Sequence, residues 1–590
     1  MARLAEAPLA HDLHSGGARL SGGATPAIDP GLAIDWMRIA WVLSLLWLLY
    51  LVAIPIGCML IDSMTEDGFT LLNFRDFLSD RKLRDATINS FVVAAGVAVL
   101  SVLLGAPLAF GVARTSMRGK RLVNATVIIS LVSPDFLIAM AYVALAGPNA
   151  GYFNRLIRDG LQIGEGPGPL NIFSLWGLIF TAIPHGVAFV YLTLVPALRN
   201  VDPALDEAAR LQGATASRAI RDITIPLMRP ALLSGALLAF AGSLAMYGPP
   251  HMLRLNVLTI SAREAMVRLD FKSASVASVV LICMSLVALL LYRFSTRQAE
   301  RFRTLGGKGF TLRDIDLGIG NKLLTALGVG YALIALLVPY GGMLMVSLMR
   351  TVGEGVSAGN WTLANYIMVI QEPAIRRAAA LSLLLAAASA TLVVIMGLIV
   401  AYVIVRTRFR GRAVLDYLSI LPLAVPGTAL AIALAVVYLS WPLNALGFYG
   451  SFGILLVAYL TRFVTFGVRT SQSTLIQVSP ELEEASRIAG AGPLTTVLLI
   501  TVPIIRRSLI YTWILVFILA LPELSSSVIL KGIHTQTLAT ALLDIWNGNG
   551  GLAMACAFGM TLFAAVALLL VLAVTVARRS TRHTGLALSG

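Results

Sequence analysis

Charged residues are scarce in this sequence of 590 residues. Asp, Glu, Lys and Arg together make up only 13% of the chain, whereas hydrophobic residues make up 58%. In soluble globular proteins roughly a quarter of the residues are charged. The composition therefore excludes a soluble globular protein of this length and predicts a chain that is surrounded by lipid.

Cysteine is almost absent. The three cysteines, Cys58, Cys283 and Cys556, lie far apart in the chain, each within an apolar stretch. This spacing excludes both a disulfide framework and a cysteine-based metal site. We expect all three to be small residues of the protein core.

Catalytic motifs are lacking as well. A phosphate-binding loop needs the pattern Gly-x-x-x-x-Gly-Lys-Ser/Thr, and Gly306-Gly307-Lys308 lacks the first glycine and the hydroxyl residue. A membrane-embedded enzyme would need clustered His, Asp and Glu or a nucleophile beside a base, and the sequence has neither. We therefore expect no catalytic residue, no metal site and no bound cofactor in this chain.

Long apolar stretches are what the sequence has in abundance. A bilayer core is about 30 Å thick, and a helix needs roughly 20 apolar residues to cross it. Twelve such stretches occur, at 36–61, 87–112, 122–146, 172–197, 231–248, 273–292, 323–349, 378–405, 413–440, 451–468, 508–530 and 551–577. Pro134, Pro422, Pro426 and Pro522 interrupt some of them, which a membrane bundle tolerates. The sequence thus predicts an all-α membrane protein with twelve transmembrane helices.

The net charge of +15 lies mainly in alternate connections between these stretches. The basic residues are Arg114, Arg118, Lys120, Arg121, Arg293, Arg297, Arg301, Arg303, Lys308, Arg406, Arg408, Arg410, Arg412, Arg578, Arg579 and Arg582. By contrast, the connection 62–86 holds six acidic and four basic residues. Such asymmetry sets membrane orientation and predicts cytoplasmic N- and C-termini. The excess of positive charge therefore indicates lipid and no nucleic acid as a partner.

The chain contains an internal repeat. The segment 105–134 is repeated 292 positions later as 397–426, with matching Gly, Ala, Arg-Thr, Arg-Gly and Pro residues. Further along, the offset falls to 277, because the first half has a longer Gly- and Pro-rich connection at 147–171. Each half carries six apolar stretches, so both enter the membrane in the same direction. The sequence predicts two parallel six-helix repeats about an axis along the membrane normal.

The repeat divides the chain into five parts. We predict a cytoplasmic tail, a first six-helix half, a cytoplasmic linker, a second six-helix half and a second cytoplasmic tail. Their bounds are 1–35, 36–292, 293–322, 323–577 and 578–590.

Two connections on the predicted cytoplasmic side are long and resemble each other. The first, 203–226, reads Pro203-Ala-Leu-Asp-Glu207-Ala208-Ala209-Arg-Leu-Gln-Gly213 and later Ile225-Pro226. The second, 480–503, reads Pro480-Glu-Leu-Glu-Glu484-Ala485-Ser486-Arg-Ile-Ala-Gly490 and later Val502-Pro503. Proline in the first turn followed by acidic residues favours the start of a short helix, and glycine permits a sharp turn after it. We expect the second proline to end each loop near the membrane.

Both connections resemble the EAA loop of ABC importer permeases, in which Glu-Ala-Ala, three residues and Gly precede an Ile-x-Leu-Pro segment. Ser486 replaces the second alanine, one small residue for another. The resemblance implies the type I ABC importer permease fold and a helix that couples the chain to a separate ATPase. The coupling residues would be Glu207, Ala208, Ala209, Gly213, Glu484, Ala485, Ser486 and Gly490.

The resemblance also implies partners and a location. Such a permease works with two copies of an ATPase subunit, which bind ATP and Mg, and with a periplasmic substrate-binding protein, in a bacterial inner membrane. A twelve-helix secondary transporter is an alternative, since it too is built from two six-helix halves. It would leave the twin loops unexplained.

The cargo is implied by a second likeness. Fused double permeases are typical of ferric-iron importers and of near relatives for thiamine, phosphonates and sugar phosphates. The segment 521–530 with Asp544-Ile545-Trp546 is similar to a segment of the iron family, although here the order is Pro-Glu-Leu. The resemblance favours ferric iron, with a phosphonate, a sugar phosphate, thiamine or a polyamine as alternatives.

Ionisable residues within the apolar stretches are candidates for the passage, because a charge at mid-bilayer costs about 2.5–3.5 kcal/mol. Glu523 follows Pro522 and could line the pore, where a carboxylate suits a hard cation. Alternatively, it could be a buried acid paired with Arg462. Asp135, directly after Pro134, is a second candidate for the pore lining.

Two further features are candidates for a gate. His185 and Arg462 occupy equivalent positions at the 277 offset, which favours a gate or a structural pair. The segment from Tyr247 to His251 is the counterpart of 523–527, and we expect a gate loop there. We expect the lone His251 to be a surface residue.

Overall fold

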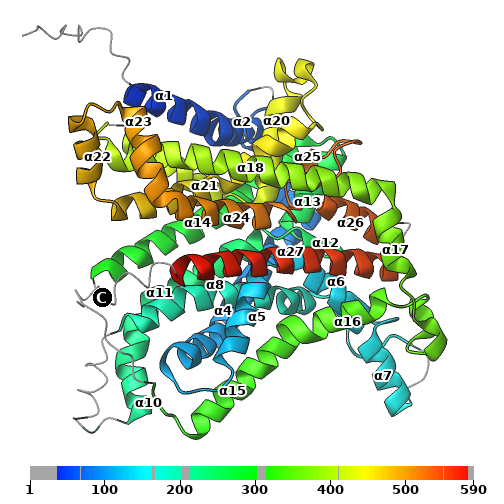
Figure 1. Cartoon of the computed structure of the whole chain (residues 1–590). Coiled ribbons are helices and arrows are strands. Elements are labelled where there is room, and N and C mark those ends of the chain that lie inside the picture. The colour runs from blue at the N-terminus through cyan, green and yellow to red at the C-terminus, as the bar shows by residue number, and fades with distance from the viewer. Residues whose placement is uncertain are drawn as a thin grey trace, which may run out of the picture.

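The computed structural model describes residues 36–66, 68–162, 166–201, 211, 213, 215–301, 314–409, 411–548 and 551–582. Over these residues the chain is a bundle of helices without a named strand (Figure 1). The predicted all-α membrane fold is therefore confirmed.

Ten helical spans among the described residues are long and apolar enough to cross a membrane. They are Trp36–Ser63 (containing α1, Trp36–Leu48, and α2, Ile54–Ser63), α4 (Arg81–Arg114), α8 (Leu175–Arg199), Ile220–Leu244 (containing α11, Ile225–Leu244), Phe271–Tyr292 of α14 (Phe271–Arg301), Ile319–Ser347 (containing α15, Ile319–Ala332, and α16, Val338–Ser347), α18 (Pro373–Arg406), α21 (Phe452–Gln477), Pro493–Ala520 (containing α23, Pro493–Thr496, and α24, Val502–Ala520) and Gly551–Ala573 of α27 (Gly551–Arg582).

The predicted spans 122–146 and 413–440 are bent instead of straight. They consist of α5 (Lys120–Val132) with α6 (Asp135–Ala146), bent by 103°, and of α19 (Arg412–Ala424) with α20 (Gly427–Leu439), bent by 112°. Proline lacks an N–H and forces the preceding residue out of the helical conformation. The helices accordingly break at Pro134 and at Pro426. The spans number twelve if each bent pair is one span.

Four of the long spans contain a five-residue π-helical turn directly before a proline-containing helix start. These turns are η1 (Leu49–Ala53), η2 (Ile220–Thr224), η3 (Leu333–Leu337) and η7 (Val497–Thr501). A wider turn accommodates a proline that cannot donate a hydrogen bond. The sequence analysis led us to expect that Pro226 and Pro503 end the two loops. They do not. They lie within helices that continue from the loops.

The internal repeat is visible in the helix bounds. α4 and α18 each have 34 residues and start 292 positions apart. α8 and α21 start 277 positions apart, as do α11 and α24. In each half the long helix packs along the same two partners: α4 against α8 and α11, and α18 against α21 and α24.

The first span of each half packs on the opposite half. α1 contacts α18 and α19, and α2 contacts α20, whereas α15 contacts α5 and α16 contacts α6. Figure 1 shows α1 beside α18 and α15 beside α5. The two halves are thus interlocked as well as covalently linked.

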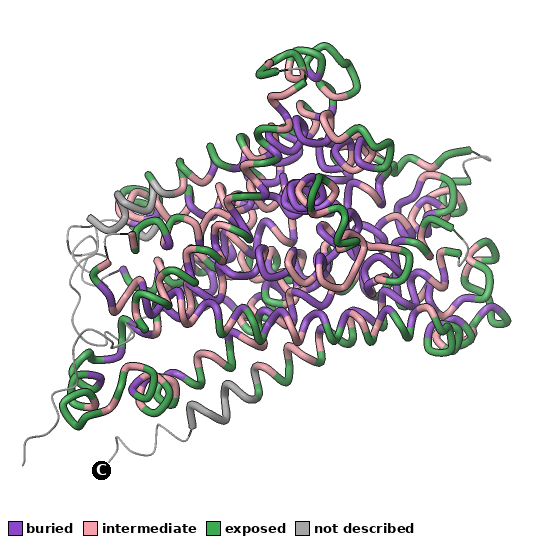
Figure 2. The backbone as a smooth tube through the Cα atoms, turned by 90° about the horizontal axis from the view of Figure 1, so that it is seen from above, coloured by how far each residue is buried: buried purple, intermediate pink, exposed green. Residues whose placement is uncertain are grey.

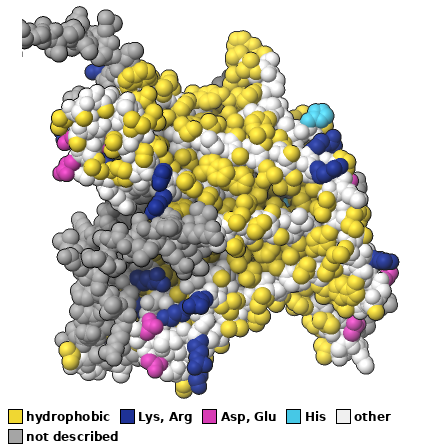
Figure 3. Space-filling model, in the orientation of Figure 1, with side chains coloured by type: hydrophobic (Ala, Val, Ile, Leu, Met, Phe, Trp, Pro, Cys, Tyr) yellow, Lys and Arg dark blue, Asp and Glu magenta, His cyan; other side chains and the backbone are white. Residues whose placement is uncertain are grey.

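The surface agrees with a lipid environment. Buried residues fill the interior of the bundle (Figure 2). Hydrophobic side chains cover the middle of the face in Figure 3, and charged side chains gather toward its two ends. Contrary to expectation, Cys58 and Cys283 are exposed, and only Cys556 of the three lies in the core. A thiol is apolar enough for a lipid-facing position.

Candidate functional site

The second predicted coupling loop forms a short exposed helix, α22 (Pro480–Ile488), at one end of the bundle. We call this the α22 end. The helix begins at the predicted proline, and the Ser479 hydroxyl caps it by accepting a hydrogen bond from the Glu481 N–H at 3.3 Å. Glu484 and Ala485 are exposed, and the Ser486 hydroxyl bonds that of Thr496 at 3.1 Å. Of the proposed coupling residues of this half, Glu484, Ala485 and Gly490 are therefore exposed, whereas Ser486 is partly covered.

The two glycines of the loops form the turns that the sequence predicted. Gly213 has φ +79° and Gly490 has φ +89°. A Cβ at either position would meet nothing within 4 Å, so the requirement for glycine is purely conformational. Glu207, Ala208 and Ala209 of the first loop lie outside the described residues.

Each loop also exposes a large aliphatic side chain just before its glycine, at a position that the motif does not mark. Leu211 and Ile488 are both 89% exposed. They are equivalent at the 277 offset and each stands two residues before its glycine. Single exposed hydrophobic residues are ordinary, but the recurrence at equivalent loop positions was a signal available in the sequence.

Glu523 and Arg462 form an ion pair inside the bundle. Arg462 Nε, on α21, lies 3.3 Å from Glu523 Oε1, and the glutamate side chain is only 3% exposed. The carboxylate also accepts the N–H of Ser526. The predicted span 508–530 placed Glu523 within a helix. In the structure it lies in a turn, because α24 ends at Ala520 and α25 (Ser527–Leu530) begins later. The pairing with Arg462 is the second of the two alternatives drawn from the sequence.

Arg462 also acts on the first half. Its charge interacts electrostatically with Asp135, the first residue of α6. A Cβ on Gly427 would overlap the Arg462 guanidinium, and Gly427 is the counterpart of Asp135 at the 292 offset. One cation therefore pairs with Glu523 of the second half, acts electrostatically on Asp135 of the first half and lies at the start of α20.

His185 on α8 has a different environment from its counterpart Arg462. It hydrogen-bonds the backbone of Leu131 near the end of α5. The two equivalent positions therefore both contact a bent helix pair, but with different chemistry. Their role in a gate stays a prediction.

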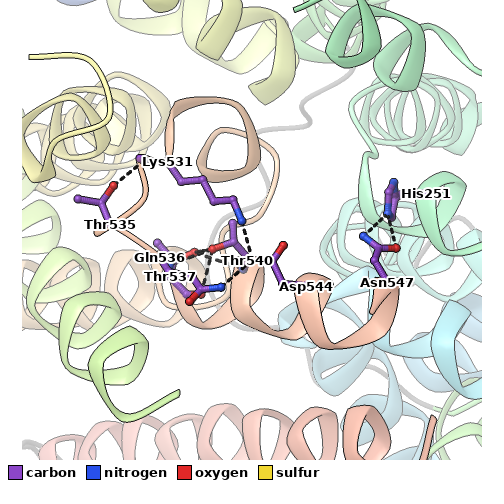
Figure 4. Close-up of polar contacts among 9 residues, drawn as sticks. His251, Lys531, Thr535, Gln536, Thr537, Thr540, Asp544 and Asn547 are labelled. Carbon is purple, nitrogen blue, oxygen red and sulfur yellow. Dashed lines mark hydrogen bonds and ion pairs between the residues drawn. The ribbon is translucent and has the colours of Figure 1, made fainter. Parts of the chain in front are cut away.

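The segment from Tyr247 to His251 lies at the other end of the bundle, which we call the α26 end after α26 (Leu538–Asn547). The fully buried Tyr247 ring stacks on His251 with centroids 5.5 Å apart, and its hydroxyl lies 3.3 Å from Nδ1. Nε2 of His251 lies 3.2 Å from Oδ1 of Asn547 (Figure 4). His251 is thus a half-buried link between the halves and not the surface residue that we expected.

The electrostatics of His251 follow from this position. Burial lowers the pKa of His251, and the hydrogen bond to Asn547 opposes that effect only in part. Arg263 and Arg254 also disfavour a positive charge there. A neutral imidazole has one donor and one acceptor nitrogen, and either tautomer can pair with the Tyr247 hydroxyl at Nδ1 and with the Asn547 amide at Nε2.

Polar contacts with nearby residues of the second half fix α26 in place. Asp544 Oδ2 lies 2.7 Å from Lys531 Nζ and 2.6 Å from Gln536 Nε2 (Figure 4). Thr537 and Thr540 cap the start of α26 reciprocally. Asn547 therefore reaches His251 from a helix that is fixed at its start and middle.

Comparisons with known proteins agree with these features. Residues 101–304 match the family model described as binding-protein-dependent transport system inner membrane component. The chain is 33% identical over 227 residues to a probable sulfate transport system permease protein, cysT, of Nephroselmis olivacea. That match covers 37% of this chain and 76% of the relative.

Two longer relatives carry names that refer to iron. The ferric transport system permease protein FbpB of Actinobacillus pleuropneumoniae is 25% identical over 482 residues, covering 79% of this chain and 68% of that protein. A putative ferric transport system permease protein, FbpB 1, of Haemophilus influenzae is 26% identical over 518 residues, covering 85% and 79%.

Proposed function

The chain belongs to the family of binding-protein-dependent transport system inner membrane components, and from this premise we propose that it forms the passage of an ATP-driven importer. The observation that carries the proposal is the pair of loops, each with an exposed aliphatic residue and a positive-φ glycine at equivalent positions. Two like sites on one chain fit two copies of one ATPase subunit. ATP and Mg would bind to that subunit, and this chain would hydrolyse nothing.

We place the α22 end in the cytoplasm of a bacterial cell and the α26 end toward a periplasmic binding protein. The start of α1 and the end of α27 both lie at the α22 end (Figure 1). Together with the basic residues of the alternate connections, this supports cytoplasmic N- and C-termini.

The proposed passage runs between the halves. The ion pair of Arg462 and Glu523, with Asp135 nearby, would lie along it, and His185 would lie on the opposite side. Tyr247 with His251 would close it at the α26 end, where the hydrogen bond to Asn547 joins the two halves. This group of Arg462, Glu523 and Asp135 contains two carboxylates and one guanidinium, so acidic side chains outnumber basic ones.

The proposed cargo is ferric iron. Two relatives are named for ferric transport, and the excess of carboxylate favours a hard cation that prefers oxygen ligands. The relative named for sulfate transport makes an anion an alternative cargo. A phosphonate, a sugar phosphate, thiamine and a polyamine are further alternatives. An anion would be attracted to Arg462 and repelled by Asp135.

Reconstitution in liposomes tests the proposal. The chain is combined with a candidate ATPase and binding protein from the same genome, and uptake of labelled ferric iron and of sulfate is measured. We expect iron uptake that requires ATP and both partners, and lower iron uptake with Glu523→Gln at unchanged ATPase binding. Uptake that follows a proton gradient without ATP would instead indicate a secondary transporter.

A further inference from the structure

A buried carboxylate lies at the base of α22. Glu483 is 3% exposed, whereas Glu481 and Glu484 beside it on the same helix are exposed. Its Oε2 accepts a hydrogen bond from the Tyr402 hydroxyl at 2.8 Å. A buried carboxylate is costly unless it is paired, so these contacts determine which way α22 faces.

The remaining oxygen of Glu483 has two donors. Oε1 lies 3.1 Å from Nε of Arg406, at the end of α18, and 3.1 Å from the hydroxyl of Thr501, in the η7 turn. Arg406 and Glu483 are both largely buried. The carboxylate therefore joins α22 to α18 and to the span that contains α24.

Arg406 extends the connection to a fourth element. Its Nη2 donates to the carbonyls of Leu475 and Val478, at 3.1 and 2.8 Å, where α21 ends. The last carbonyls of a helix have no partner within it, and a cation there also suits the helix dipole. The end of α21, which leads into α22, and the η7 turn, which leads on to α24, thus both meet α18 at this ion pair.

The first half repeats part of this arrangement. Arg114, 292 positions before Arg406, donates through Nη1 to the carbonyls of Leu198 and Val201, at 3.3 and 3.2 Å. Those carbonyls are the counterparts, at the 277 offset, of the two that Arg406 binds. A guanidinium on the end of the preceding helix is therefore common to both halves.

The acid and its hydroxyl partner differ between the halves. Phe110 stands where the second half has Tyr402, and Asp206, which lies outside the described residues, stands where it has Glu483. Thr224, the counterpart of Thr501, is retained and buried. The sequence of the chain itself thus supplies conservative substitutions for the second half.

We propose that Glu483 is a positioning residue that transmits movement of α22 to α18 and α24. The inference rests on the proposed function, because an ATPase must move α22. Separating Glu483 from Arg406 would leave a buried charge uncompensated, which is costly. We therefore expect α22 and the end of α18 to move as one unit. A displacement of α22 then reaches α24, whose far end carries the turn with Glu523, without being absorbed by bending of the loop.

The test uses the full chain with its ATPase and binding protein in liposomes. Glu483→Gln keeps the side-chain size and removes the charge. We expect it to bind the ATPase and to leave the KM for ATP unchanged, while the cargo imported per ATP falls by about fivefold or more, within the usual range of coupling factors. A wild-type ratio of import to hydrolysis would overturn the proposal.

Matched variants separate positioning from folding. Glu481→Gln removes an exposed charge from the same helix and should leave the ratio unchanged. Glu483→Asp copies the acid of the first half and should restore most of the ratio. Proportional loss of hydrolysis and import in Glu483→Gln, without rescue by aspartate, would show a merely structural role and overturn the proposal.

Two outcomes remain to be distinguished. If Glu483→Gln yields no folded complex, Tyr402→Phe copies the first half and removes one hydrogen bond, and we expect it to lower the ratio about twofold. An unchanged ratio would overturn the proposal. Failure of the wild-type chain to bind an ATPase or to import would contradict the proposed function instead.

Discussion

At the α22 end the two halves of the chain share their exposed loop features, whereas in the interior their charges differ. Both loops expose an aliphatic residue and turn at a positive-φ glycine, and both are preceded by a helix whose end an arginine caps. In the interior, Arg462 of the second half stands where the first half has His185. Asp135 of the first half stands where the second has Gly427.

The difference has a physical reason if the chain works as proposed. Two identical ATPase subunits need two equivalent docking sites, so the exposed residues and the glycine turns of the two loops should match. A single cargo passes once between the halves, and nothing requires both walls of that passage to carry the same charges. Like charges at equivalent positions would face each other across the axis and repel.

We expect the largest effect from breaking the ion pair of Arg462 and Glu523, because the first half has His185 in place of the arginine. Arg462→Met leaves the buried Glu523 carboxylate without its cation, which costs about 3–5 kcal/mol. Its counterpart His185→Leu removes one hydrogen bond and should cost about 1 kcal/mol. Thermal unfolding of the purified chain in detergent would measure both.

A double variant checks the cause. Replacing a buried ion pair with hydrophobic residues is often neutral, so Arg462→Met with Glu523→Leu should recover most of the lost stability while remaining defective in transport. If the double variant is as unstable as Arg462→Met, the arginine stabilises the fold by packing and not by its charge.

The second prediction tests the similarity of the two loops. Leu211→Ser and Ile488→Ser should each weaken ATPase binding, since burying one such side chain contributes about 1.5–3 kcal/mol. Both residues are exposed, so the thermal stability of the isolated chain should not change. Titration of the ATPase onto the chain in nanodiscs gives the affinities. Strongly unequal effects would show that the two loops do not serve equivalent sites.

The third prediction concerns the glycine that faces Arg462. Gly427→Ala places a Cβ on the guanidinium and should cost about 1–3 kcal/mol, as overpacking does, and reduce transport. Gly330 on α15 has open space at its Cβ position, so Gly330→Ala is a matched control without loss. Transport and unfolding assays on both variants measure the difference, and equal behaviour would refute the close approach.

The sequence was sufficient for features that depend on local chemistry. Apolar length predicts the spans, proline and the acidic first turn predict the start of α22, and glycine predicts the turns at residues 213 and 490. Features that depend on tertiary packing were not accessible. Pro134 and Pro422 look alike in sequence, yet only the first breaks a helix, since Pro422 lies inside α19.

The same limit applied to the functional residues. The motif singles out Glu484, but nothing in the sequence marks Glu483 as the buried acid, and only the contacts of α22 with α18 show it. His251 and Asn547 are 296 positions apart and belong to different halves. No spacing rule connects residues that meet only when two halves close on each other.

The smallest expected effect concerns the link at the α26 end. Burial lowers the pKa of His251, so the imidazole binds a proton more readily when the link is open and the ring is solvated, with a pKa near 6.5. Protons therefore favour the open arrangement, and the link loses stability as the pH falls below about 6.5, by at most about 1.4 kcal/mol per pH unit for one group. Hydrogen exchange of 538–547, corrected for the intrinsic pH dependence, should show this loss of protection. His251→Gln, which keeps a polar partner for Asn547 and cannot titrate, should abolish the pH dependence, and an identical profile in that variant would assign it to another group.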